Sequence, residues 1–120
     1  MAKVIVVDDA VADLKLMQSI LESGGHHVVP YTDGDGLEEK VAAERPDVVL
    51  LDIVMPKRNG YEALRSLKKD ERTRRTPVVI VSSKNQESDI VWGKRQGADD
   101  YVPKPFTPEQ LLAAVRRFAG

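Results

Sequence analysis

The sequence predicts an α/β fold, a doubly wound, five-stranded parallel sheet flanked by five helices. Two observations support this prediction. Short runs rich in valine, isoleucine and leucine recur along the chain, and segments with the periodicity of an amphipathic helix separate them. Because parallel neighbouring strands need a crossover to carry the chain back along the sheet, strands and helices should alternate, with right-handed connections.

Each predicted strand is a short run in which apolar residues occupy several consecutive positions. This pattern is typical of strands that are buried on both faces of a parallel sheet. The five runs are 3–7 (KVIVV), 27–31 (HVVPY), 47–51 (DVVLL), 77–82 (PVVIVS) and 100–102 (DYV). His26 and His27 lie at the start of the second run with no third ligand nearby, which favours a loop over a metal site.

The first helix is predicted from apolar residues at helical spacing, which are Leu14, Met17, Ile20 and Leu21. We expect Gly24 and Gly25 to end it in left-handed conformations. The second helix begins at Leu37, and we expect it to end at Arg45, before Pro46.

The remaining helices are predicted from two apolar faces and one set of capping residues. The third helix is marked by Tyr61, Leu64 and Leu67. The fourth has a face of small residues, and its markers are Ile90, Gly93 and Gly97. For the fifth, Thr107 can cap the helix, Pro108 suits its first turn and Gln110 completes a capping box.

The composition limits the classes of function that the chain can have. At 120 residues and 42% hydrophobic content we expect a single domain over 1–120, with no output domain. The 18 Lys and Arg residues nearly balance 19 Asp and Glu residues, which gives no reason to expect nucleic acid or an anionic membrane as a partner. There is no cysteine for thiol chemistry and no apolar run long enough for a membrane span or secretion signal. We therefore expect a cytoplasmic protein. A monomer is a separate expectation, which the composition does not decide.

Polar residues gather where the predicted strands end. These residues are Asp8, Asp9, Asp52, Ser82, Ser83 and Lys104. The carboxyl ends of the strands form the ligand edge of a doubly wound sheet. Taken singly, each residue has an ordinary explanation: Asp9 or Asp13 could cap a helix, Ser82 could begin a turn and Lys104 could be a surface charge. Taken together, three carboxylates at one apolar edge repel one another unless a cation or a proton intervenes.

A hard divalent cation fits this donor set, because Mg²⁺ prefers oxygen ligands and is commonly held by one or two carboxylates and a phosphoryl oxygen. Asp9 and Asp52 are the expected direct ligands, Asp8 acts through water, and the backbone carbonyl of Val54 fills another position. Mn²⁺ could take the place of Mg²⁺.

The same residues suit phosphoryl transfer to a carboxylate. A bound divalent ion would prepare Asp52 as the nucleophile toward phosphorus. Lys104 would pair with one phosphoryl oxygen, and Ser82 would donate a hydrogen bond to another. The charged end of the apolar run VVLLD is therefore explained as the point where the sheet meets the reacting group.

The chain resembles the receiver domain of two-component response regulators over essentially its whole length. The motifs that carry the resemblance are VVDD, LLDIVMP followed by NG, VIVSS and GADDYVPKPF. The resemblance implies that Asp52 accepts a phosphoryl group from the phosphohistidine of a histidine kinase, or from acetyl phosphate. It implies a stoichiometric switch rather than an enzyme, with strand order 2-1-3-4-5.

The resemblance also assigns roles to individual residues. Asp8 and Asp9 match the acidic metal-binding pair, and Lys104, followed by a cis peptide at Pro105, matches the phosphate-binding lysine. Ser82 and Tyr101 match the switch hydroxyl and the switch aromatic residue. Phosphorylation would then change the surface of the fourth helix, fifth strand and fifth helix. For Tyr101 a second reading stays open, a half-buried strand residue with its hydroxyl in water.

Trp92 and the surrounding stretch DIVWGKRQGADDYVPKP point to a protein partner. If the small residues of the fourth helix face the sheet, Trp92 points outward as a docking contact or folds over the neighbouring helix. The stretch is similar to the small regulators of twitching-motility and related chemosensory systems. Such a regulator would drive an output partner or drain phosphate from a shared kinase.

Three other functions stay in view. A phosphatase of the haloacid-dehalogenase type also uses a strand-end aspartate and Mg²⁺, but it needs a second carboxylate two residues later, where this chain has Val54. A receiver-like module that binds its partner without phosphorylation is the second alternative. A flavin-binding redox protein is the third, although few aromatic residues are available to hold the ring.

Overall fold

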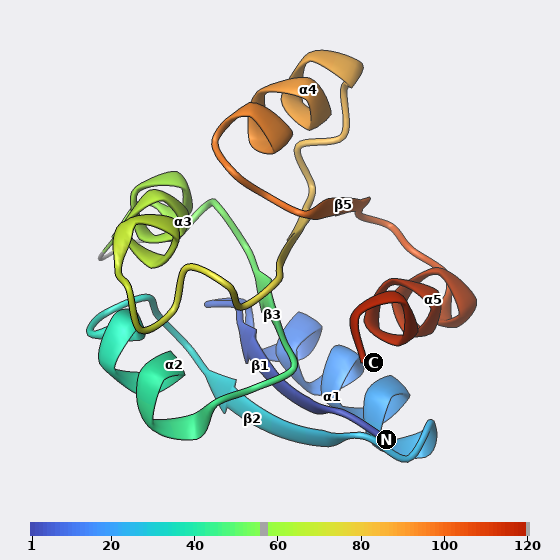
Figure 1. The fold of residues 1–120 in the computed structure, drawn as a ribbon. Helices are drawn as coiled ribbons and strands as arrows, with labels where there is room; N and C mark the ends of the chain where they lie inside the picture. The colour runs from blue at the N-terminus through green and yellow to red at the C-terminus, as the bar shows by residue number, and fades with distance from the viewer. Residues whose placement is uncertain (56–57, 120) are drawn as a thin grey trace.

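The computed structural model describes residues 1–55 and 58–119, and strands and helices alternate along them as predicted (Figure 1). The strands are β1 (Lys3–Val7), β2 (His27–Tyr31), β3 (Val48–Leu51), β4 (Val78–Ser82) and β5 (Asp100–Pro103). The helices are α1 (Val11–Ser23), α2 (Leu37–Glu44), α3 (Gly60–Lys69), α4 (Glu87–Arg95) and α5 (Pro108–Phe118). Each predicted strand begins and ends within one residue of the observed strand.

Within the described residues, the five strands form one parallel sheet in the order β2-β1-β3-β4-β5, which confirms the predicted fold class. The register places Val7 beside Leu51 and Ser82 beside Pro103. The carboxyl ends of β1, β3, β4 and β5 therefore lie along one edge of the sheet. In doubly wound sheets this edge is where ligands bind.

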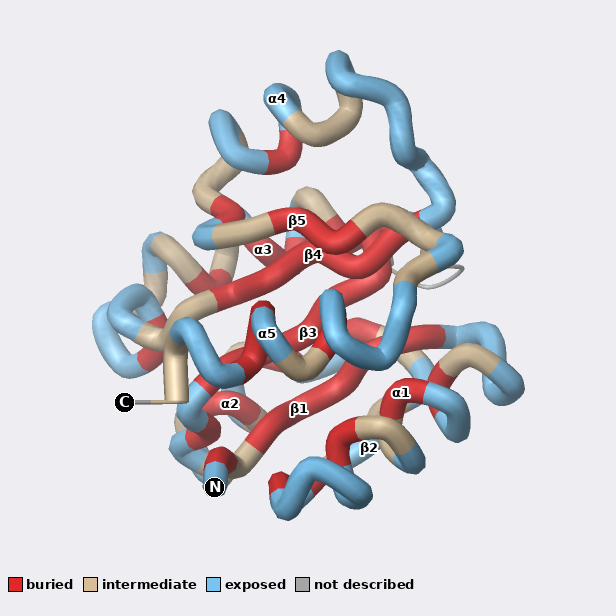
Figure 2. The backbone as a smooth tube through the Cα atoms, turned by 90° about the vertical axis from the view of Figure 1, so that its right-hand side faces the viewer, coloured by how far each residue is buried: buried red, intermediate tan, exposed pale blue. Residues whose placement is uncertain are grey.

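The sheet divides the apolar core into two clusters, and Figure 2 shows the buried strands between the helices. One cluster joins Val4 and Val6 of β1 to α1 and α5. The other joins Ile5 and Val7 to α2 and α3. Because successive side chains of a strand point to opposite faces, a strand that is covered on both faces needs apolar residues at consecutive positions. This requirement explains the pattern of the run KVIVV.

The helix starts and stops largely follow the sequence signals. At the start of α5, the N–H of Gln110 donates to Thr107 Oγ1 (3.2 Å), and the N–H of Thr107 donates to Gln110 Oε1 (2.8 Å), so the predicted capping box is confirmed. Helix α2 begins at Leu37 and is capped at its end by Arg45, whose φ is 49°. The start was predicted at the correct residue, and the expected end at Arg45 falls on the C-cap, one residue past the last helical residue.

Two expectations about glycines were wrong. Gly24 has a φ of −84°, so after α1 the left-handed conformation falls on Gly25, with a φ of 88°. Gly97 lies beyond the end of α4 at Arg95 and has a φ of 114°, so it is not part of the helix face. Glycine is compatible with a helix interior and with a left-handed turn, and spacing alone does not separate the two.

The two histidines have different environments although they are neighbours. His27 begins β2 and is exposed, whereas His26 precedes the strand and is only 8% exposed. The N–H of Ala2 donates to His26 Nδ1 at 3.0 Å, and burial lowers the pKa of this imidazole. His26 therefore lies in a loop, as expected, but it anchors the N-terminal segment to that loop.

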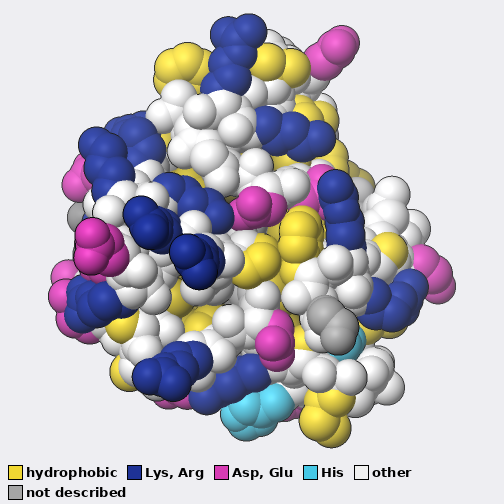
Figure 3. All heavy atoms as spheres, viewed as in Figure 1, with side chains coloured by type: hydrophobic (Ala, Val, Ile, Leu, Met, Phe, Trp, Pro, Cys, Tyr) yellow, Lys and Arg dark blue, Asp and Glu magenta, His cyan; other side chains and the backbone are white. Residues whose placement is uncertain are grey.

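The surface carries charges of both signs. Figure 3 shows acidic and basic side chains interspersed on the face that Figure 1 presents, with basic groups gathered over α3. None of the helices in the described ranges is long and apolar enough to cross a membrane.

Candidate functional site

The sheet brings the predicted polar residues together at its carboxyl edge. Asp8 follows β1, Asp52 follows β3, Ser82 ends β4 and Lys104 follows β5. The backbone N–H of Asp52 donates to the carbonyl of Val7 (2.9 Å), and that of Lys104 donates to the carbonyl of Ser82 (2.8 Å). These bonds continue the strand pairing past the ends of the strands and fix the positions of both residues.

Three carboxylates form the acidic part of the site. One oxygen from each of Asp8, Asp9 and Asp52 lies within 4.8 Å of the others. Asp8 is fully buried and Asp52 is 7% exposed, whereas Asp9 is exposed. A set of buried and exposed carboxylates so close together suits a hard divalent cation, which takes oxygen ligands and keeps part of its water shell. The described residues therefore fit the expected metal.

Lys104 supplies the positive charge of the site. Its Nζ lies 2.7 Å from Asp8 Oδ2, 2.8 Å from Asp13 Oδ2 and 3.6 Å from Asp52 Oδ2. Burial lowers the pKa of Lys104, but the hydrogen bonds to Asp13 and Asp8 outweigh it and raise the pKa above the usual range. The ammonium group is thus charged over the physiological pH range. The Lys104–Pro105 peptide bond is cis.

Asp52 is buried and yet close to a cation. Burial raises its pKa, the N–H of Val54 and the charge of Lys104 lower it, and Asp8 raises it again. The net direction is upward. The Val54 N–H donates to Asp52 Oδ1 at 3.2 Å and holds the carboxylate in one orientation. The side chain of Val54 is 53% exposed at the mouth of the site.

Asp13 is a site residue that sequence reasoning considered only as a helix cap. The cap of α1 is Ala10, without a side-chain hydrogen bond, and Asp13 instead contacts Lys104 from the first turn of the helix. The position of Asp13 in the sequence could have indicated this contact. Helix α1 begins shortly after Asp8 and Asp9, and Asp13 lies on its first turn.

Ser82 and Tyr101 are linked through the segment after β4. Ser82 is fully buried, and its Oγ accepts the N–H of Lys84 at 3.2 Å. The hydroxyl of Tyr101 donates to the carbonyl of Lys84. Tyr101 is only 6% exposed, and burial raises the pKa of its phenol to about 12. The alternative of a half-buried ring with its hydroxyl in water is therefore wrong.

Two glycines allow close packing around the site. A Cβ on Gly60, the glycine of the NG motif, would lie 2.3 Å from Ile53 Cα and 2.6 Å from the Asp52 carbonyl oxygen. A Cβ on Gly93 in α4 would lie 2.9 Å from Tyr101 Cδ2. Gly60 thus lets α3 begin against the backbone of the site, and Gly93 makes room for the inward Tyr101 ring. Trp92, next to Gly93, is 51% exposed on the outside of α4.

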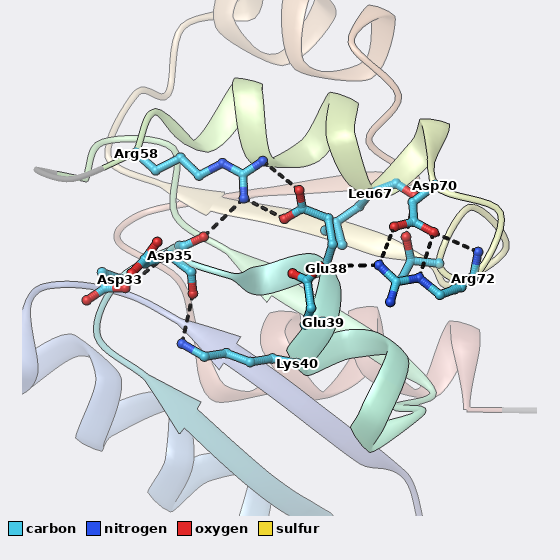
Figure 4. Close-up of polar contacts among 11 residues, drawn as sticks. Asp33, Asp35, Glu38, Glu39, Lys40, Arg58, Leu67, Asp70 and Arg72 are labelled. Carbon is cyan, nitrogen blue, oxygen red and sulfur yellow. Dashed lines mark hydrogen bonds and ion pairs between the residues drawn. The ribbon is translucent and has the colours of Figure 1, made fainter.

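An ion pair joins Arg58, which lies shortly before α3, to helix α2. Arg58 donates to both carboxylate oxygens of Glu38 in α2, at 2.5 and 3.0 Å, and to the carbonyl of Gly34 at 3.2 Å. Figure 4 shows Glu38 reaching from α2 toward the guanidinium group. The hydrogen bond from Arg58 lowers the pKa of Glu38. Arg58 is thereby tied to the start of α2.

Comparison with known proteins identifies the family. The protein-family model of the response regulator receiver domain matches residues 4–116 of this chain. The chain is 46% identical over 115 residues to Protein PilH of Pseudomonas aeruginosa, covering 96% of this chain and 95% of PilH. It spans only 44% to 48% of the length of several longer transcriptional regulators that it also matches.

Solved structures agree with this match. The Vibrio cholerae chemotaxis protein CheY4 is 30% identical with a TM-score of 0.88, and the match covers 98% of both chains. The receiver domain of the Pseudomonas aeruginosa sensor histidine kinase PA1611, solved with a magnesium ion in its active site cleft, is 26% identical with a TM-score of 0.90. That match covers 99% of this chain and 98% of the other. The chain therefore belongs to the response regulator receiver domain family.

Proposed function

We propose that this protein is a phosphorylation switch in which Asp52 accepts one phosphoryl group from the phosphohistidine of a histidine kinase. The observation that carries the proposal is the position of Asp52, which is buried at the sheet edge with two further carboxylates and the Lys104 ammonium around it. A structural ion pair would need one carboxylate. The surplus of negative charge is explained by a function that brings in a cation and a phosphoryl group.

The transfer conserves atoms and charge without an added reagent. A carboxylate oxygen of Asp52 attacks phosphorus, a new P–O bond forms, and the P–N bond to the kinase histidine breaks. The electron pair returns to the imidazole nitrogen, which takes up a proton from water. With acetyl phosphate as donor, the P–O bond to the acetyl group breaks instead, and acetate leaves without needing a proton.

Asp8, Asp9 and Asp52 would hold the divalent ion, Mg²⁺ or Mn²⁺, together with the Val54 carbonyl. When bound, the ion supplies positive charge that offsets the charge of the transferred group. The likeness to a receiver domain solved with magnesium supports this assignment. Lys104 would form an ion pair with one phosphoryl oxygen, and the Ser82 hydroxyl would donate a hydrogen bond to another.

The output would be a change in the surface of α4, β5 and α5. The phosphoryl group would attract the Ser82 hydroxyl. Lys84, whose N–H donates to Ser82 and whose carbonyl accepts the hydrogen bond from the Tyr101 hydroxyl, would move together with Ser82. Helix α4 would respond through Gly93, because this residue packs against the Tyr101 ring. Trp92 and Val91 are exposed on the same helix and would contact the partner protein.

We further propose that the protein works as a stand-alone receiver in a chemosensory system of the twitching-motility or chemotaxis type, in the cytoplasm and as a monomer. The near full-length match to PilH and the likeness to CheY4 support the assignment to such a chemosensory system. The protein would act stoichiometrically, with self-catalysed phosphorylation and dephosphorylation as its own chemistry.

The test is the intact mass of the protein after incubation with acetyl phosphate and Mg²⁺. We expect a gain of one phosphoryl group in the wild type, and none in Asp52→Asn or in the presence of EDTA. Steady hydrolysis of a generic phosphomonoester would instead indicate a phosphatase. No mass gain, together with no response of Trp92 fluorescence to beryllofluoride, would indicate a module that binds without phosphorylation.

A further inference from the structure

We propose that Asp13 is a positioning residue that draws Lys104 away from Asp52 and so opposes binding of a phosphoryl group. This inference rests on the proposed function, because it concerns how readily Lys104 reaches a group on Asp52. It assigns to the first turn of α1 a role in setting the sensitivity of the switch.

The distances around Lys104 carry the inference. The Nζ is within hydrogen-bond distance of Asp8 Oδ2 (2.7 Å) and Asp13 Oδ2 (2.8 Å). Its distance to Asp52 Oδ2 is 3.6 Å, too long for a hydrogen bond. An ammonium group has three N–H donors, so two are committed to Asp8 and Asp13. The cation is therefore held closer to α1 than to the residue that would be phosphorylated.

Asp13 differs from Asp8 in burial. Asp8 is fully buried and belongs to the group of carboxylates that fit the metal, whereas the side chain of Asp13 is 43% exposed and lies outside that group. Removal of Asp13 would therefore leave the metal ligands in place and leave no buried charge without a partner, since Lys104 keeps Asp8. The Asp13–Lys104 contact can therefore change the affinity of the site for a phosphoryl group without being needed to assemble the site.

The direction of the effect follows from electrostatics. A carboxylate 2.8 Å from the Nζ offsets part of the positive field that Lys104 presents toward Asp52. A phosphoryl group must compete with this carboxylate for the same ammonium. Partly exposed ion pairs contribute up to about 1 kcal/mol, so loss of Asp13 should tighten phosphoryl binding by roughly threefold to fivefold.

The test is the affinity of the full chain for beryllofluoride, a mimic of the phosphoryl group, measured by calorimetry at saturating Mg²⁺ for each variant. We expect Asp13→Asn to bind roughly threefold to fivefold more tightly than the wild type. Asp13→Glu keeps the carboxylate and should restore an affinity close to that of the wild type. Glu109→Gln is the matched control, because it also removes an exposed acidic residue from the first turn of a helix, α5, and should have no effect.

The outcomes separate this inference from the proposed function. If the wild type neither binds beryllofluoride nor accepts a phosphoryl group, the proposed function is wrong and the inference falls with it. If the wild type binds but Asp13→Asn has unchanged or weaker affinity, the inference alone is overturned. Weaker binding would show that Asp13 orients Lys104 for the phosphoryl group. An equal gain in Glu109→Gln would reduce the effect to net charge.

Discussion

Helices α3 and α4 lie next to neighbouring strands of one sheet, but they are anchored to very different extents. Helix α3 has four buried residues, which are Gly60, Ala63, Leu64 and Leu67. In α4, which the structure describes in full, Gly93 is the one buried residue. Figure 2 shows α4 mostly in the colour of exposed residues.

This difference indicates which part of the molecule can move at a low cost in free energy. Segments with few buried apolar contacts open at a small fraction of the global unfolding free energy. Helix α3 begins at Gly60, which packs closely against the backbone of Asp52 and Ile53. Helix α4 packs on the sheet through Gly93, which lies close to Tyr101 and Ile80, and through the partly buried Ile90, so it is the helix that a change in Tyr101 would shift.

The largest expected effect comes from removing the anchor of α3. Leu67→Ala should lower the free energy of unfolding by about 2–5 kcal/mol, because it leaves a cavity at a residue that is 1% exposed. Val91→Ala on α4 is the control, since Val91 is 44% exposed and its loss should cost less than about 0.5 kcal/mol. Urea denaturation measures both values. Similar costs for the two variants would contradict the unequal anchoring of the helices.

The second prediction concerns the contact that holds α4. Gly93→Ala places a methyl group 2.9 Å from both Tyr101 Cδ2 and Ile80 Cδ1, so the ring must move. Overpacking costs about 1–3 kcal/mol, and the better helix propensity of alanine returns up to about 1 kcal/mol. We therefore expect a net loss of about 1 kcal/mol in the free energy of unfolding.

A double-mutant cycle with Tyr101→Ala isolates the ring contact. Without the ring, Gly93→Ala should become neutral or stabilising, because the helix propensity gain remains and Ile80 has a flexible side chain end. Urea unfolding of the four proteins gives the coupling energy. An identical cost of Gly93→Ala in both backgrounds would show that Tyr101 does not hold α4.

The sequence was sufficient to predict the fold and the main members of the site, for a physical reason. A strand that is buried on both faces must be apolar at consecutive positions, so the strands could be located, and with them the edge where Asp8, Asp52, Ser82 and Lys104 meet. The roles of these residues in phosphorylation stay predictions.

The features that were missed depend on distances between separate elements. The contact of Asp13 with Lys104 joins residues 91 positions apart, and it is set by how closely the first turn of α1 approaches the segment after β5. Tyr101 could have been half-exposed, and it is buried because Gly93 leaves space for the ring. Neither distance is encoded in the periodicity of one helix or strand.

The smallest expected effect tests whether the turn between α1 and β2 is anchored like α3 or loose like α4. Burial lowers the pKa of His26 below its usual value of 6.5, so the unfolded chain binds this proton more readily than the folded protein does. The free energy of unfolding should therefore fall as the pH drops through 6.5, and the contribution of His26 is fully retained only above that pH.

Urea denaturation of the wild type and His26→Asn between pH 7.5 and 5.5 measures this contribution. Asparagine can still accept the N–H of Ala2 but does not titrate, so the other ionisable groups cancel in the difference. We expect the wild type to lose more stability than the variant over this range. His27→Asn is the matched control for the substitution itself, because it makes the same change at the neighbouring, exposed position. Parallel curves for the wild type and His26→Asn would mean that the turn opens readily to water, and it would then belong with α4 among the loosely held parts of the molecule.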